Sequence, residues 1–225
     1  MQQNKFKAAL FDLDGVVFDT EPQYSVFWGG ICRQYHPEHP GLEHEIKGQT
    51  LTQIYDRWFS GPLLTEQESI TARLNDYEQQ MSYEYIAGFK ALIAALRQHG
   101  VKTAVVTSSN SPKMESVYRY QSGFTSLFDA ILTSEDFDRS KPDPDCYLKA
   151  AQRLDAEPDE CIVFEDSFNG LRAGRAAGMA VVGLATTNAA EAIRPLSDIQ
   201  LRDYKNLTFE RLERLLSSAK ELSKD

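Results

Sequence analysis

The sequence predicts an α/β fold built on a doubly wound parallel sheet. From Gly88 onward, short apolar segments alternate with helical segments, which is typical of a parallel sheet covered by helices on both faces. Near the amino end, the apolar run of residues 8–11 has the composition of a buried parallel strand. Between two short hinge-like stretches, residues 18–22 and 83–88, the spacing of the apolar residues is helical instead.

Local signals predict the individual elements. Residues 24–35 carry apolar and aromatic side chains at helical spacing, and the turn at residues 36–41 ends that helix. The segment 65–85 begins with Thr65 and has Glu68 three residues later, which is a capping-box pattern. A helix is also expected between residues 107 and 130. The other expected helices are 50–59, 89–99, 143–154, 167–177 and 209–222, and the expected strands are 8–11, 101–107, 130–133, 161–164 and 179–184.

Composition and length are those of an ordinary globular protein. The 225 residues suffice for one large domain or for one domain with a small insert. No apolar run reaches membrane-spanning length and the amino end lacks a signal peptide, so we expect a cytoplasmic protein that does not contact membranes. The net charge of −9 disfavours nucleic acid as a partner. We expect a monomer, with Cys32, Cys146 and Cys161 as buried reduced thiols.

Two acidic residues follow the first expected strand. Because side chains alternate along a strand, Asp12 and Asp14 can point the same way at its carboxyl end, and Gly15 lets the backbone bend there. Open α/β sheets bind ligands at that edge. Two acids in this place suit an aspartate nucleophile with a neighbouring acid/base residue, as in enzymes that form an aspartyl-phosphate. The alternative is an Asp-rich turn that only ends the strand.

Four short blocks in a fixed order carry a resemblance to a known family. They are the D-x-D-G opening and residues 105–110, 140–144 and 163–170, which read VVTSSN, SKPDP and VFEDSFNG. With these blocks the chain resembles the haloacid dehalogenase superfamily over nearly its whole length, in the β-phosphoglucomutase and sugar-phosphatase branch. The resemblance implies the strand order and a small α-helical cap inserted after the first strand. It divides the chain into a core of residues 1–17 and 88–225 and a cap of residues 18–87.

An acidic cluster is expected at the carboxyl edge of the sheet, formed by Asp12, Asp14, Glu165 and Asp166. Two unit charges about 5 Å apart cost about 3 kcal/mol at an effective dielectric of about 20, so the cluster needs a cation, and its oxygen ligands suit Mg²⁺. The resemblance assigns as ligands the carboxylates of Asp12 and Asp166 and the backbone carbonyl of Asp14. It implies that Glu165 is a direct ligand or holds a metal-bound water. As an alternative, Glu165 and Asp166 are an acid pair at a helix amino end.

Polar residues expected at the same edge suit a phosphate group. Thr107 offers a hydroxyl, and Ser108 and Ser109 offer backbone N–H groups near the start of the next helix. By themselves these residues also fit a helix cap, and Lys141 by itself fits a solvated surface charge. The resemblance implies instead that Lys141 offsets the charge of the nucleophile and binds the phosphoryl group.

The resemblance implies a two-step phosphoryl transfer. Asp12 attacks phosphorus to give an aspartyl-phosphate while Asp14 protonates the leaving oxygen, and Asp14 then deprotonates the water that attacks the phosphoenzyme. Relatives that act as dehalogenases lack the second acid, and phosphonate hydrolases have a small residue in its place, so Asp14 disfavours both activities. A non-catalytic interaction protein remains as an alternative.

The main alternatives are a phosphatase and a phosphomutase. In the mutase branch a cap-linker histidine helps to select between water and sugar, and a cap-loop arginine binds the distal phosphate; these positions align with Tyr24 and Leu51 here. Both departures favour a Mg²⁺-dependent phosphatase acting on a small phosphorylated metabolite, such as a sugar or polyol phosphate. Lys47 is expected to contact the substrate from the cap, although an exposed lysine is the alternative.

Overall fold

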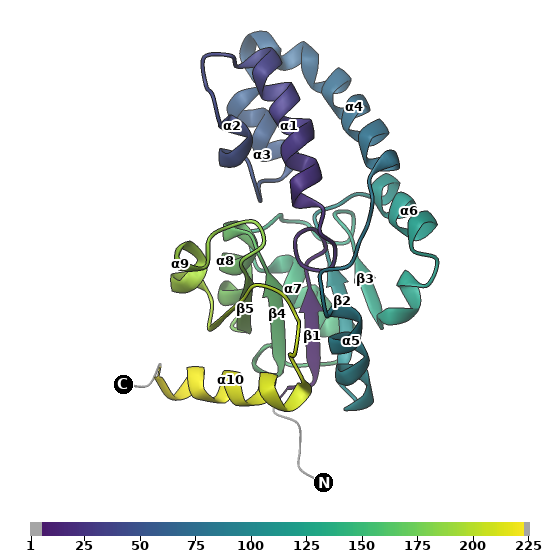
Figure 1. The fold of residues 1–225 in the computed structure, drawn as a ribbon, viewed down its shortest axis with the longest axis vertical. Helices are drawn as coiled ribbons and strands as arrows, with labels where there is room; N and C mark the ends of the chain where they lie inside the picture. The colour runs from purple at the N-terminus through teal and green to yellow at the C-terminus, as the bar shows by residue number, and fades with distance from the viewer. Residues whose placement is uncertain (1–5, 223–225) are drawn as a thin grey trace.

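The computed structural model describes residues 6–222, and their strands form one parallel sheet (Figure 1). The strand order is β3-β2-β1-β4-β5-β6, and every neighbouring pair is parallel. This arrangement confirms the predicted fold class. The strands are β1 (Ala8–Phe11), β2 (Lys102–Val106), β3 (Ala130–Leu132), β4 (Cys161–Glu165), β5 (Ala180–Leu184) and β6 (Ile199–Leu201).

Helices cover both faces of the sheet, as the side chains of β1 illustrate. Ala8 and Leu10 pack in one hydrophobic cluster with α7 and α8. Ala9 and Phe11 pack in another with α5, α6 and α10. Both faces of the strand are therefore buried, which explains its continuous apolar sequence. The helices around the sheet are α5 (Phe89–Gln98), α6 (Ser111–Tyr120), α7 (Asp145–Arg153), α8 (Phe168–Ala176), α9 (Ala190–Ile193) and α10 (Phe209–Leu222).

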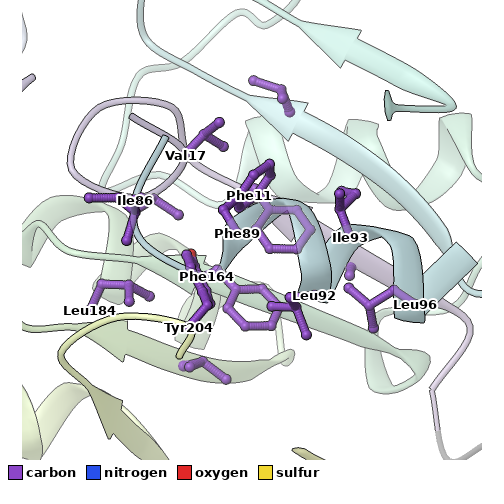
Figure 2. Packing of buried hydrophobic residues seen from close by; sticks show 14 of the residues in the cluster. Phe11, Val17, Ile86, Phe89, Leu92, Ile93, Leu96, Phe164, Leu184 and Tyr204 are labelled. Atoms are coloured by element: carbon purple, nitrogen blue, oxygen red, sulfur yellow. The ribbon is translucent and has the colours of Figure 1, made fainter. Parts of the chain in front are cut away.

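An aromatic cluster fixes the carboxyl ends of the two central strands (Figure 2). Phe11 stacks on Phe164 with ring centroids 4.5 Å apart, and Phe89 meets Phe11 edge-on at 5.4 Å. Such pairs contribute about 0.5–1.5 kcal/mol beyond the area that they bury. Because Phe11 and Phe164 directly precede Asp12 and Glu165, this packing also fixes where the acidic residues begin.

A second group of helices lies beyond the carboxyl ends of the strands, at the top of Figure 1. We call these helices the cap: α1 (Glu21–Tyr35), α2 (Leu42–Glu45), α3 (Leu51–Trp58) and α4 (Gln67–Gln80). Trp28, Ile31, Ile54 and Ile70 belong to a hydrophobic cluster formed within these helices. The two linkers to the core run side by side, since the Asp19 N–H donates to the Glu84 carbonyl at 2.9 Å. The domain boundaries at residues 17/18 and 87/88 stay a prediction.

Several local predictions differ from the structure. The capping box predicted at Thr65 is wrong, because residues 61–66 form a 3-10 helix. Helix α4 begins at Gln67, two residues after Thr65, and has no side-chain cap. A capping box occurs instead at α3, where the Thr50 hydroxyl accepts from the Gln53 backbone N–H at 3.3 Å and the Gln53 side-chain Oε1 accepts from the Thr50 N–H at 2.9 Å. Strand β6 was not predicted, since it has three residues with polar Gln200 at its centre.

The three cysteines are free and buried, as predicted. Within residues 6–222, none of the helices combines the length and the hydropathy needed to cross a membrane.

Candidate active site

The carboxyl edge of the sheet faces the cap across a cavity of about 370 Å³. Strands β1, β2 and β4 end at this cavity, and the loop before α7 reaches it from the side. The sequence-predicted site residues that line it are Asp12, Asp14, Lys47, Thr107, Ser108, Ser109, Lys141, Glu165 and Asp166. The structure therefore brings all of the predicted site residues to one place.

Three acidic residues that line the cavity form a potential metal-binding group. Asp12, Glu165 and Asp166 each offer an oxygen, and these oxygens lie within 4.8 Å of one another. The pKa of Asp12 is raised to about 7, chiefly by burial. The positive charge of Lys141 lowers this pKa, while the neighbouring carboxylates of Glu165 and Asp14 raise it. Burial likewise raises the pKa of Asp166, and Glu165 adds to the effect. The single charge of Lys141 does not offset these three carboxylates, and their hard oxygen donors suit Mg²⁺.

Lys141 supplies the positive charge nearest to Asp12. Its buried Nζ donates to Asp12 Oδ1 at 2.6 Å, to Glu165 Oε1 at 2.7 Å and to the Val106 carbonyl at 3.0 Å. Burial lowers the pKa of Lys141, but the carboxylates of Asp12 and Glu165 outweigh it and hold that pKa well above its ordinary value. The lysine is therefore charged, and the predicted alternative of a solvated surface lysine is wrong. The Lys141–Pro142 peptide bond is cis.

Glu165 is held by hydrogen bonds on both of its oxygens. Oε1 accepts from Lys141 and from the Tyr147 hydroxyl at 3.0 Å, while Oε2 accepts from the backbone N–H groups of Asp166 and Ser167 at 2.9 and 3.1 Å. Gly170 allows this arrangement, because a Cβ there would lie 1.6 Å from Glu165 Oε1. Glu165 thus anchors Lys141. Its predicted part in metal binding stays a prediction.

Asp14 is surrounded by donors from three segments. Thr20 Oγ1 donates to Oδ1 at 2.6 Å, and Ser109 Oγ donates to Oδ2 at 3.3 Å. The ammonium of Lys113 also donates to Oδ2, and this lysine is only 4% exposed. Asp14 is thus oriented toward the cavity by the cap linker, by the loop after β2 and by α6.

Lys113 was missed in the sequence analysis, although one signal was available. It lies in the first turn of α6, where Asn110 caps the helix by accepting from the Lys113 N–H at 3.2 Å. Cations are disfavoured near a helix amino end, so a lysine in that turn needs another reason to be there. Its partner Asp14 lies 99 residues away in the sequence, which pattern analysis cannot detect.

The expected phosphate-binding loop lies at the end of β2. Thr107 is 1% exposed, and its Oγ1 accepts from the Ser109 N–H at 3.0 Å. The Ser109 N–H, which was expected to face an anion, is therefore used within the loop. The Thr107 hydroxyl proton and the Ser108 N–H remain the groups suited to a phosphate in the cavity. The Ser109 hydroxyl donates to Asp14 at 3.3 Å and would have to turn from that contact to reach a phosphate.

The cap contributes polar side chains to the opposite wall. Lys47 Nζ lies 3.9 Å from a carboxylate oxygen of Glu21, and both residues line the cavity. The Tyr24 hydroxyl donates to Glu78 Oε1 at 2.7 Å. Burial, and next the charge of Asp14, raise the pKa of Glu21 to about 7. Leu51 also lines the cavity and adds an apolar surface.

Comparison with known proteins establishes the family. Residues 6–178 match the family described as haloacid dehalogenase-like hydrolase. The chain therefore belongs to the haloacid dehalogenase-like hydrolases, as the four sequence blocks predicted. The crystal structure of a family IA, variant 3 hydrolase from Entamoeba histolytica has the same fold, with a TM-score of 0.80 at 20% identity over 94% of this chain and 100% of the other.

Curated relatives include phosphatases and a mutase. Validoxylamine A 7'-phosphate phosphatase from Streptomyces hygroscopicus subsp. limoneus is 31% identical over 88% of this chain and 94% of its own length. Fructose-1-phosphate phosphatase YqaB from Escherichia coli is 27% identical over 79% and 96%. Beta-phosphoglucomutase from Bacillus subtilis is 29% identical over 92% and 93%.

Proposed function

We propose that this protein is a Mg²⁺-dependent phosphatase of small phosphorylated metabolites. The observation that carries the proposal is the pair Asp12 and Asp14 at the carboxyl end of β1, each facing its own buried lysine at the edge of the cavity. Membership of a hydrolase family that includes phosphatase relatives supports the same activity. A non-catalytic interaction protein would have no need for this combination of buried charges.

The proposed reaction has two halves. In the first, a carboxylate oxygen of Asp12 bonds to phosphorus, the bond between phosphorus and the ester oxygen breaks, and Asp14 gives its proton to that oxygen. In the second, Asp14 takes a proton from water, the water oxygen bonds to phosphorus, and the Asp12–phosphorus bond breaks to release inorganic phosphate. Lys141 offsets the charge of Asp12, and Thr107, Ser108 and Ser109 bind the phosphoryl oxygens.

We assign the metal site to the carboxylates of Asp12 and Asp166 and the backbone carbonyl of Asp14. Lys141 occupies one oxygen of Asp12 and Thr187 occupies one oxygen of Asp166, which leaves the second oxygen of each for a cation. Glu165, whose oxygens already accept hydrogen bonds, serves best through a metal-bound water. When bound, Mg²⁺ would neutralise charge on the phosphoryl oxygens.

The substrate we propose is a sugar or polyol monophosphate. A cavity of about 370 Å³ between cap and core suits a compact molecule rather than a protein or a nucleic acid. Lys47 and Glu21 on the cap offer a donor and an acceptor for substrate hydroxyl groups. Relatives named for the phosphates of validoxylamine A and fructose support this class. The cytoplasmic location and the monomeric state stay predictions.

The alternative activity is a phosphomutase of the β-phosphoglucomutase type, since one relative carries that name. Two cap positions favour hydrolysis. The Tyr24 hydroxyl donates its hydrogen bond to Glu78, and the Leu51 side chain has no charge that could bind a second phosphate. Loss of a charge-assisted contact there costs about 1.5–3 kcal/mol, which is about ten- to a hundredfold in affinity.

One assay tests both activities. A panel of sugar, polyol and nucleotide monophosphates with Mg²⁺, read out as released phosphate, tests for hydrolysis. Phosphate release from none of these compounds would contradict the proposed phosphatase. β-glucose 1-phosphate with catalytic glucose 1,6-bisphosphate tests for the mutase. We expect free phosphate to exceed glucose 6-phosphate; the opposite ratio would establish the mutase.

A further inference from the structure

We propose that Lys113 is a positioning residue for Asp14, a role that rests on the proposed phosphoryl transfer. The Lys113 side chain is almost fully buried and its ammonium donates to Asp14 Oδ2. The ring centre of Tyr24 lies 4.8 Å from the same nitrogen. A buried ammonium needs an acceptor for its protons, and Asp14 Oδ2 is the oxygen that accepts from Lys113, so this contact ties the Asp14 side chain to one place.

Each of the two buried lysines that line the cavity contacts a different catalytic carboxylate. Lys141 pairs with Asp12 and Glu165, whereas Lys113 pairs with Asp14. Lys141 therefore contacts the nucleophile, and Lys113 contacts the residue that transfers protons.

Lys113 restrains the oxygen of Asp14 that other groups hold only loosely. Thr20 holds Oδ1 at 2.6 Å, but Ser109 is 3.3 Å from Oδ2. Without Lys113, the carboxylate would be held firmly at one oxygen and could rotate about it. A misplacement of about 1 Å in a catalytic group can reduce the rate about a hundredfold.

The cap encloses Lys113 from above. Tyr24 of α1 covers the ammonium with its ring and donates its hydroxyl to Glu78 of α4, so two cap helices pack over one core lysine. The position of Asp14 therefore depends on the cap through Lys113, as well as through Thr20 in the linker.

The test uses two kinds of leaving group. An alkyl phosphate needs a proton on its leaving oxygen, while p-nitrophenyl phosphate releases a stable phenolate without one. Lys113→Met and Asp14→Asn are assayed for kcat/KM with p-nitrophenyl phosphate and with the alkyl phosphate that the wild type hydrolyses fastest. Inorganic phosphate, as a competitive inhibitor, reports binding at the phosphate site. Lys90→Met is the matched control, since Lys90 lies 4.4 Å from the ring centre of Tyr85 but outside the cavity.

We expect Lys113→Met to lower kcat/KM for the alkyl phosphate about 10- to 100-fold and for p-nitrophenyl phosphate less than about 5-fold. Asp14→Asn should give the same pattern, the inhibition constant for phosphate should hold within about twofold, and Lys113→Arg should restore part of the alkyl activity. Equal losses of kcat/KM on both substrates would overturn the proposal. Combined with a raised inhibition constant for phosphate, they would show that Lys113 binds the phosphate. Combined with a lowered melting temperature, they would show that Lys113 has only a structural role. If Lys113→Met does not fold, Lys113→Gln decides by the same comparison. Absence of wild-type phosphate release would instead refute the phosphatase itself.

Discussion

At the residue scale, Asp12 is the position on which the proposed chemistry depends most. Asp12→Asn keeps the shape of the side chain and removes only its nucleophilic charge. We expect turnover to fall at least about a thousandfold. The melting temperature should be equal or higher above pH 7, because the wild-type carboxylate is buried with a pKa raised to about 7.

The control for Asp12→Asn is Asp19→Asn, which changes an exposed carboxylate in the same segment. Its activity should match that of the wild type. A folded Asp12→Asn variant with near-wild-type turnover would show that another group is the nucleophile.

Glu21 predicts a pH dependence of stability. Its pKa is raised from 4.5 to about 7 by burial first and by Asp14 second, so the folded protein binds this proton more tightly than the unfolded chain. The associated stabilisation is present below about pH 4.5 and is lost as the pH rises through 7. Between pH 5 and 8 with chelator, the unfolding free energy of the wild type should fall by about 2–3 kcal/mol relative to Glu21→Gln. Urea titrations measure this difference, and parallel curves for the two proteins would contradict it.

At the scale of elements, the loop between α2 and α3 brings the cap onto the core at Gly48. This glycine has a φ of +70°, and a Cβ there would lie 2.6 Å from Ser167 Cβ. Gly41 also has a positive φ, +89°, but has open space around it. Gly41→Ala should therefore cost about 1 kcal/mol of backbone strain alone, whereas Gly48→Ala must also move the cap away from Ser167.

The expected difference is functional. Gly48→Ala should lower kcat/KM at least about tenfold more than Gly41→Ala, because the cap residues lose their positions at the cavity. Steady-state kinetics on the two variants measure it. Equal kinetics would mean that the contact at Ser167 has no part in holding the cap over the site.

Elements were predictable where one local force dominates. Runs of buried apolar residues located β1, β2, β4 and β5 to within about a residue or two, since both faces of these strands are covered. Helix α4 was predicted to end at residue 85 but ends at Gln80. Met81 and Tyr83 continue the apolar pattern, yet they pack on the core cluster rather than within the cap. Periodicity does not reveal which of two hydrophobic clusters a residue joins.

The same limit applies to the site. The residues at strand ends were predictable because the carboxyl ends of parallel strands meet at one edge. Lys113, Thr187 and Tyr147 reach the same cavity or its acids from helices and loops whose placement depends on the whole fold. Tertiary packing, rather than local sequence, brings these donors to the acidic residues.

At the scale of the whole molecule, a bound cation should add to the stability of the folded chain. A ligand at 100 times its dissociation constant stabilises by about 2.7 kcal/mol, which for about 150–250 residues is a rise in melting temperature of about 5–10 °C. We expect Mg²⁺ to give such a rise in the wild type and a much smaller one in Asp166→Asn, as measured by thermal denaturation.

Asp159→Asn is the matched control for this measurement, because Asp159 is an exposed carboxylate far from the acidic cluster. It should show the full wild-type rise. An equal rise in Asp166→Asn would place the cation elsewhere in the protein.

The three buried thiols lie in different parts of the protein, so their reaction with a labelling reagent reports where the structure opens. Cys32 lies in the hydrophobic cluster of the cap, while Cys146 on α7 and Cys161 at the start of β4 share a hydrophobic cluster of the core. Burial raises the pKa of the Cys32 and Cys146 thiols to about 11 and that of Cys161 to about 12, so alkylating reagents must wait until a region opens. Labelling followed by mass spectrometry would therefore measure separately the rates at which the cap and the core open. Modification of Cys32 alone would reveal a cap that unfolds while the sheet stays intact.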